Sequence, residues 1–162
     1  TSGSSGSGSD YWNSTATTSS LVSIGTNTGL NASGSTYIAW CFAPIVGYSK
    51  LGKYRGNGNA DGTFVYCGFK PSIIMIKDAD NAGENWFLFD NKRPGYNFNA
   101  NLFNINDTGA ETTSGANGID ILSNGFKMRS TNNGTNRADG GFNYLAFGQP
   151  LVGSNNVPST AR

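Results

Sequence analysis

The chain has 162 residues, enough for one domain with a sizeable hydrophobic core. Only 13% of the residues are charged, the net charge is +1, and no segment concentrates the basic residues, which argues against a nucleic-acid partner. The absence of histidine excludes histidine-based catalysis, and no apolar run is long enough for insertion into a membrane. Ser, Thr, Asn and 23 Gly dominate the polar positions. This composition favours turns and suits a rigid extracellular or virion-surface protein.

Residues 1–10 are rich in Gly and Ser, which predicts a flexible linker. After them, short apolar runs alternate with turn clusters, and no window of helical length shows a 3.6-residue apolar period free of Gly and Asn. The pattern therefore predicts an all-β fold, a two-sheet antiparallel β-sandwich of the jelly-roll kind. The strands are expected at 21–24, 36–46, 49–54, 63–69, 72–77, 85–90, 102–105, 119–122, 126–129 and 142–147.

One hairpin is clear from the sequence. Pro71 cannot donate a hydrogen bond to a β-ladder, so we expect it at the corner before the apolar strand 72–77. The polar turn 78–84 follows, and 85–90 returns as the next strand. Trp40, Phe42, Ile74, Ile76, Leu88, Leu145 and Phe147 are the predicted core.

The two cysteines, Cys41 and Cys67, both fall in apolar strand-like runs. The favoured interpretation is that both are reduced and buried and serve as small hydrophobes. The alternative is a single disulfide between neighbouring strands. Two thiols without histidine do not suggest a zinc site, and no metal or other cofactor is expected.

An internal similarity bears on the domain organisation. Thr26-Asn27, Asn31 and the aromatic positions after them recur 105 positions later, so that 24–42 aligns without gaps on 129–147. We expect residues 11–47 to be either the end of an upstream repeat or N-terminal strands of the sandwich. Residues 48–162 are expected to form the main β-sandwich domain.

Several motifs together resemble a known family. They are 37–43 (YIAWCFA), 47–50 (GYSK), 56–58 (GNG), 61–62 (DG), 64–71 (FVYCGFKP), 122–127 (LSNGFK) and the closing pair 161–162 (AR). This set resembles uncharacterised domains of phage and marine-metagenome proteins, which are similar to concanavalin-type lectin sandwiches and occur in tail-fibre-like or virion surface proteins. The resemblance covers roughly residues 11–162. It implies a fold and a context, and it carries over no functional residue.

The candidate binding site is the segment after the strand 85–90. It combines flat aromatic rings with amides and charged groups in a long irregular stretch, where binding residues tend to lie. These are the groups that satisfy sugar hydroxyls. The alternative is that the aromatic residues pin the loop to the sandwich while the Asn residues cap turns. The predicted ligand-binding residues are Asp90, Arg93, Tyr96, Asn97, Phe98 and Asn99.

Catalytic and metal-binding alternatives find less support. Glycoside hydrolysis needs two opposed carboxylates. The chain has ten acidic residues, but nearly all lie in turn-rich segments, while Asp90 and Asp120 border predicted strands and could face a groove. The turn 78–84 gathers oxygen ligands suited to calcium, yet it lacks the bidentate acid of a helix–loop–helix site. We therefore expect a protein that is not an enzyme.

The expected function is that of a surface module of a phage tail fibre or other virion appendage, which mediates adhesion to a host cell-surface glycan or receptor. The expected partners are that glycan or receptor, neighbouring virion subunits and further copies in a homo-oligomer, and the expected location is the virion surface or the cell exterior. The alternatives are a purely structural decoration or assembly domain of a virion, and a cellular extracellular adhesin or filament subunit.

Overall fold

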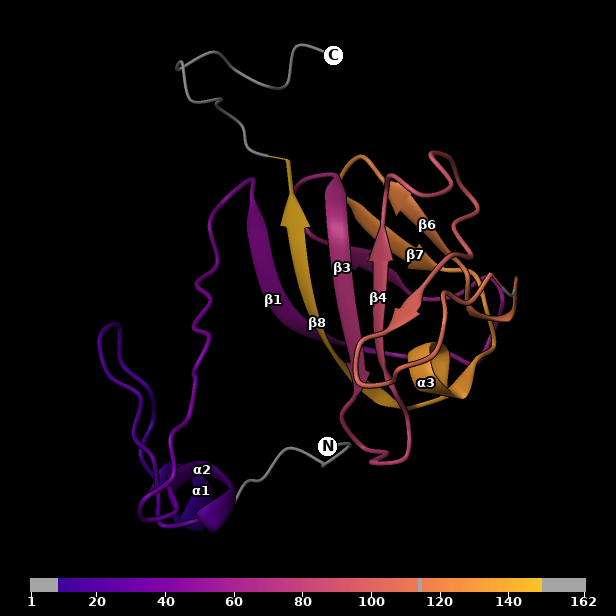
Figure 1. The fold of residues 1–162 in the computed structure, drawn as a ribbon. Coiled ribbons are helices and arrows are strands. Elements are labelled where there is room, and N and C mark those ends of the chain that lie inside the picture. The colour runs from indigo at the N-terminus through magenta and orange to yellow at the C-terminus, as the bar shows by residue number, and fades with distance from the viewer. Residues whose placement is uncertain (1–8, 114, 150–162) are drawn as a thin grey trace. The chain divides into compact units, whose positions relative to one another are not determined.

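A computed structural model of the chain describes residues 9–113 and 115–149. The described residues divide into two compact units, a smaller one up to residue 42 and a larger one from residue 43 onward. The larger unit contains two antiparallel sheets (Figure 1). The all-β, two-sheet prediction is therefore confirmed.

The larger sheet has five strands in the order β1-β8-β3-β4-β5. The smaller sheet has three strands in the order β2-β7-β6. The strands are β1 Ser49–Arg55, β2 Phe64–Tyr66, β3 Pro71–Asp78, β4 Trp86–Asp90, β5 Phe103–Asn104, β6 Ile119–Leu122, β7 Gly125–Met128 and β8 Gly141–Gly148. Helix is limited to α1 Ser9–Trp12, α2 Thr28–Asn31, α3 Asn133–Asn136 and the 3-10 turn η1 Gly115–Asn117.

The predicted hairpin is present. β3 begins at Pro71, its register on β8 shifts just after that residue, and β3 pairs with β4 from Ile73–Asp90 to Lys77–Trp86. Asp78 closes the turn between them, because its Oδ1 accepts the backbone N–H groups of Asp80 and Asn81. The last strand, β8, lies between β1 and β3, so it is an interior strand with a partner on each side.

The core lies between the inner faces of the two sheets. Ile74 and Ile76 are fully buried, as predicted, and they share the inner face with Phe89, Phe142 and Ala146. Opposite them, the smaller sheet contributes a second buried set, Val65, Ile119, Ile121, Phe126 and Met128. Tyr54 of β1 stacks on Phe142, with ring centroids 5.1 Å apart.

Five of the predicted core residues are placed differently. Leu88, Leu145 and Phe147 point to the outer face of the larger sheet and are only half-buried, whereas their neighbours Phe87, Phe89, Tyr144 and Ala146 face inward. The prediction was wrong because β4 and β8 are apolar on both faces, so alternation along the strand does not identify the inner one. Trp40 and Phe42 are 82% and 50% exposed, since the segment that carries them belongs to neither sheet.

The expected strands at 21–24 and 36–46 are also absent. Residues 35–44 have no strand or bridge assignment, and the first bridge after them joins Ile45 to Ser49. Cys41 is exposed and Cys67 is buried, and both are free, so neither the pair of buried thiols nor the disulfide is realised. Burial raises the pKa of the Cys67 thiol to about 11, despite the opposing charge of Lys50.

Candidate functional site

The site begins at the end of β4, where Asp90 shapes the start of the predicted binding loop. Its Oδ1 accepts the backbone N–H groups of Lys92 (2.8 Å) and Arg93 (3.1 Å). An Asp that captures the N–H groups two and three residues ahead closes a tight turn, and this turn directs the chain away from the sheet.

Arg93 fixes the same turn from the other side. Its Nε lies 2.6 Å from Asp90 Oδ2, one terminal nitrogen lies 3.4 Å from Glu111 Oε1, and its guanidinium stacks 3.9 Å from the ring centroid of Phe103. Partial burial on its own would raise the pKa of Asp90, but the two backbone N–H groups and the charge of Arg93 outweigh it and hold that pKa below its ordinary value.

This arrangement predicts a pH-dependent stability difference. We expect Asp90→Asn to lower the free energy of unfolding at pH 7 by about 1–2 kcal/mol, the contribution of partly exposed hydrogen bonds to a charged group. Because the folded-state pKa is depressed, this contribution is complete above about pH 4 and is lost as the pH falls through the folded pKa. Urea unfolding of both proteins between pH 7 and pH 3 should show the gap closing. A gap that stays constant over this range would contradict the assigned role of the carboxylate.

Two asparagines then attach the loop to the smaller sheet. The side-chain amide of Asn97 donates to the carbonyl of Ile121 (3.0 Å), and its oxygen accepts the N–H of the same residue (2.9 Å). Asn99 exchanges both backbone hydrogen bonds with Ile119, and its buried amide donates to the carbonyl of Asp90 (2.6 Å). The loop therefore starts on the larger sheet and ends on the smaller one, so it bridges one end of the sandwich.

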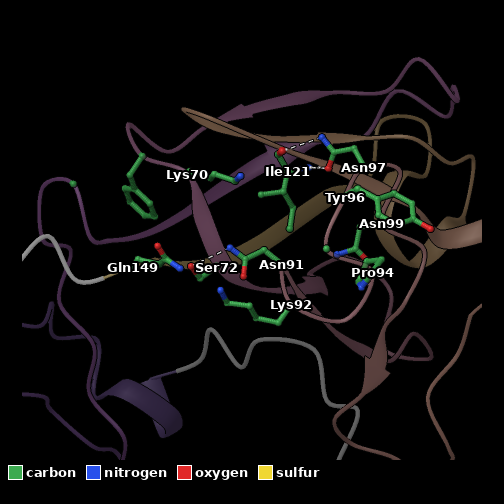
Figure 2. Close-up of a pocket in the computed structure, with 13 residues that line it drawn as sticks. Lys70, Ser72, Asn91, Lys92, Pro94, Tyr96, Asn97, Asn99, Ile121 and Gln149 are labelled. Atoms are coloured by element: carbon green, nitrogen blue, oxygen red, sulfur yellow. Dashed lines mark hydrogen bonds between the residues drawn. The ribbon is translucent and has the colours of Figure 1, made fainter. Parts of the chain in front are cut away.

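A cleft of about 520 Å³ opens beside this bridge, and Figure 2 shows the side chains arranged around it. Its lining is mostly polar and joins the loop to the start of β3 and the end of β8. The residues are Gly47, Phe69, Lys70, Ser72, Asn91, Lys92, Pro94, Gly95, Tyr96, Asn97, Asn99, Ile121 and Gln149. Amides, hydroxyls, aromatic rings and two lysines thus line one cleft.

The structure divides the predicted ligand-binding residues into three groups. Tyr96, Asn97 and Asn99 line the cleft. Asp90 and Arg93 line an adjoining, more apolar cavity of about 480 Å³, which shares the side chains of Ser72, Asn91, Lys92 and Gln149 with the cleft. Phe98, which follows a cis peptide bond, lines neither cavity.

Phe98 instead packs against Gly118. A Cβ at Gly118 would lie only 1.9 Å from the Phe98 ring, so the ring fits here because residue 118 has no side chain. The alternative that an aromatic residue pins the loop thus fits Phe98. Tyr96 is different, because 77% of it is exposed at the cleft.

Sequence reasoning missed Lys70, Ser72 and Gln149. Lys70 and Ser72 flank the proline that begins β3, and Gln149 follows β8, far away in sequence. They meet because β8 pairs with β3 between Pro71 and Gly148. No local signal reveals that pairing, so these residues become visible only once the strand order is known.

The acidic turn after β3 uses its main carboxylate internally. Asp78 is buried, and beside its two backbone partners it faces Arg137 Nη2, 3.2 Å from Oδ2. Within residues 9–113 and 115–149, no group of three or more Cys, Asp or Glu side chains is arranged to hold a metal ion.

The fold and the cleft define a two-sheet antiparallel β-sandwich with a polar, lysine-containing cleft at one end of the sheets. The chain belongs to the family described as a domain of unknown function, DUF7483, whose model matches residues 1–150. No curated protein matches the chain, and no solved structure matches it either. In the described residues, no helix has the length and apolar character needed to cross a membrane.

Proposed function

We propose that this chain is a non-enzymatic binding module that holds an anionic saccharide in the cleft, as an adhesion domain of a virion appendage or other extracellular surface. We also propose that the sandwich is a jelly-roll of the concanavalin-like kind. The virion and tail-fibre context of the proposal comes from the family resemblance. The expected partners are a host-surface glycan or receptor and neighbouring subunits of a homo-oligomeric virion part.

The observation that carries the proposal is the chemistry of the cleft lining. The exposed ring of Tyr96 offers an apolar face to a sugar ring, and Ser72, Asn91 and Gln149 offer hydroxyl and amide groups to its hydroxyls. The side-chain oxygen of Asn91 is buried and has no hydrogen-bond partner among the described residues.

The charge of the lining favours an acidic sugar over a neutral one. Lys70 and Lys92 both line the cleft, and among its described lining residues there is no carboxylate. Two cations without a neutralising acid attract a carboxylate or sulfate group on the ligand, and this attraction weakens as salt is added.

Titration calorimetry with uronic-acid oligosaccharides and with neutral oligosaccharides of equal length tests the proposal. We expect Tyr96→Ala to weaken binding of the acidic oligosaccharide at least about tenfold, because it removes the stacking face. Lys70→Gln with Lys92→Gln should weaken it similarly and abolish its salt dependence. Matched controls are Tyr66→Ala and Lys53→Gln, which change exposed residues outside the cleft.

Failure of the wild-type protein to bind either oligosaccharide, or equal losses in the control variants, would remove the cleft from consideration. Binding of the neutral oligosaccharide alone, unaffected by the lysine substitutions, would refute the anionic ligand class and keep the sugar site.

A second candidate function, an assembly domain held by contacts between copies, is favoured by the outer face of the larger sheet. The register places Leu51, Leu145, Met75, Leu88 and Phe103 in one row across all five strands. Leu51 and Phe103 are 41% and 38% exposed. On this reading a second copy covers the row, so Met75→Lys should convert an oligomer into monomers in sedimentation experiments and leave ligand binding intact.

A further inference from the structure

The smaller unit repeats a piece of local structure that the sandwich also contains. Asn27 caps α2 by accepting the N–H of Gly29 on its side chain, and Asn132 caps α3 in the same way with the N–H of Gly134. The two caps have nearly equal backbone angles, φ −62° and ψ 127° against φ −62° and ψ 134°. The two helices start 105 positions apart, which is the offset of the sequence similarity.

The hydrogen bonds around the two helices also correspond. The amide of Asn31 donates to the carbonyl of Gly25 (3.0 Å), and the amide of Asn136 donates to that of Ser130 (2.8 Å). After the helices, Ser35 N–H donates to Ala32 O (3.1 Å), as Gly140 N–H donates to Arg137 O (3.0 Å).

Between these paired residues, one residue in each copy has a left-handed backbone conformation with positive φ. It falls at Gly34 (φ 76°) and at Asp139 (φ 57°). A non-glycine residue with positive φ is uncommon, and Asp139 has one at the position where the first copy has Gly34, a residue that adopts it readily. Residues 25–35 and 130–140 therefore have the same local fold.

The segment that follows each copy has the sequence of the same strand. β8 continues from the second copy, and the equivalent residues after the first copy are 36–43. The inward positions of β8 are Phe142, Tyr144 and Ala146, and the aligned residues are Tyr37, Ala39 and Cys41, which are also aromatic or small.

Two of the three outward positions match as well. Leu145 and Phe147 align with Trp40 and Phe42, and the polar outward position Asn143 aligns with Ile38. Like β8, the segment 36–43 thus has apolar residues on both faces, as a strand in the interior of a sandwich does.

In this structure 36–43 does not behave as that strand. It has no strand assignment, and Ile38 and Trp40 are 84% and 82% exposed. Its counterpart β8 pairs with β1 and β3 along its length and has a fully buried Ala146. An extended, exposed apolar segment outside both sheets is a candidate for pairing with another sheet.

We propose that residues 25–43 form a second loop–helix–strand unit, and that their strand, 36–43, occupies the β8 position in a second sandwich of this fold. The position between β1 and β3 in the described sandwich is already filled by β8, so the partner is a sandwich whose own final strand is missing. In that partner, Cys41 lies opposite the residues equivalent to Lys50 and Ile74, as Ala146 does here.

The test supplies such a partner within one polypeptide. In the full chain, a second copy of residues 44–129 replaces residues 1–24, so the added copy has β1 to β7 and can obtain its helix and last strand only from 25–43. The original sandwich remains as an internal reference. We expect the added copy to fold, and labelling of Cys41 by a thiol reagent to slow by more than about tenfold, because the thiol moves from an exposed site to a buried one.

A second version of this protein addresses the case in which the added copy does not fold because contacts made by the last helix and strand are missing. It carries Ala32→Arg and Ala39→Tyr, which restore to the unit the arginine that faces Asp78 and the inward tyrosine of β8. If neither version protects Cys41 or adds folded β-structure to the circular dichroism spectrum, the proposal is overturned.

Two matched substitutions decide whether protection reflects the β8 geometry. Ala39→Asp places a charge at an inward position and should restore fast labelling of Cys41, whereas Ile38→Asp, at the position where β8 has Asn143, should leave Cys41 protected. Equal labelling in the two variants would show that the strand does not lie in the β8 position, and would likewise overturn the proposal.

Discussion

Replacing Phe142 with alanine is expected to lower the free energy of unfolding by about 3–5 kcal/mol, the usual cost of emptying a buried phenylalanine site. Phe142 is fully buried and stacks on Tyr54 with ring planes 18° apart. Tyr54 in turn meets Phe126 and Tyr144, so the cavity would open at the centre of an aromatic cluster that joins the two sheets.

Phe147 provides the matched control because it is the same residue type, five positions along the same strand, on the opposite face. It is half-buried and packs beside Tyr48, with ring centroids 6.0 Å apart. We expect Phe147→Ala to cost at most about half as much as Phe142→Ala, since less apolar surface returns to water. Denaturant unfolding with a common m-value measures both. Equal costs for the two variants would mean that the two faces of β8 are equally covered.

This pair of residues also shows what the sequence could predict about the fold. The turn clusters and the absence of helical periodicity indicated an all-β sandwich, and the polar turn after Ile76 indicated the hairpin of β3 and β4. The sequence did not show which face of β8 is buried, because apart from Asn143 the large residues of this strand are apolar or aromatic on both faces. Only the order of the strands tells that Phe142, rather than Phe147, meets the second sheet.

The segment around Trp40 illustrates a different limit. Its composition is that of a central strand, and the prediction of a strand there followed from intrinsic preference. A strand exists only where a sheet accepts it, and the described sandwich already has β8 in the corresponding position. Local propensity was therefore a guide to what 36–43 can form, and not to what it pairs with.

The sequence predicted one wall of the candidate site but not the other. The stretch after Asp90 stood out because it is long, rich in Asn and interrupted by Pro94 and Gly95, and it proved to bridge the two sheets beside the cleft. Its opposite wall was hidden, since Lys70 and Gln149 meet only through the pairing of β3 with β8. The separate roles of Tyr96 and Phe98 were equally hidden, because they depend on which ring finds space against Gly118.

The last residue of α3, Asn136, is the site of the second large expected effect. Asn136 is fully buried, and its amide nitrogen donates to the carbonyls of Asn59 and Ser130, both at 2.8 Å. Its side-chain oxygen accepts the N–H of Asn57 at 3.0 Å. One side chain thus joins the loop after β1 to the loop after β7.

We expect Asn136→Ala to lower the free energy of unfolding by about 2–4 kcal/mol, because it breaks one buried and two part-buried hydrogen bonds to backbone groups, and a buried group left without a partner costs about 1–3 kcal/mol. Asn136→Asp should also be strongly destabilising, since it keeps the shape but replaces the two donor bonds with a buried charge. Thermal and denaturant unfolding measure both variants.

Asn31 supplies the control that separates burial from hydrogen bonding. It stands at the same place in the duplicated unit and makes the equivalent bond to the carbonyl of Gly25, but it is exposed. Water can replace that bond, so Asn31→Ala should leave the unfolding midpoint of the sandwich unchanged. If Asn136→Ala were as mild as Asn31→Ala, the loops after β1 and β7 would be held by their backbone bonds, such as the one from Gly58 N–H to Asn136 O, and not by the buried amide.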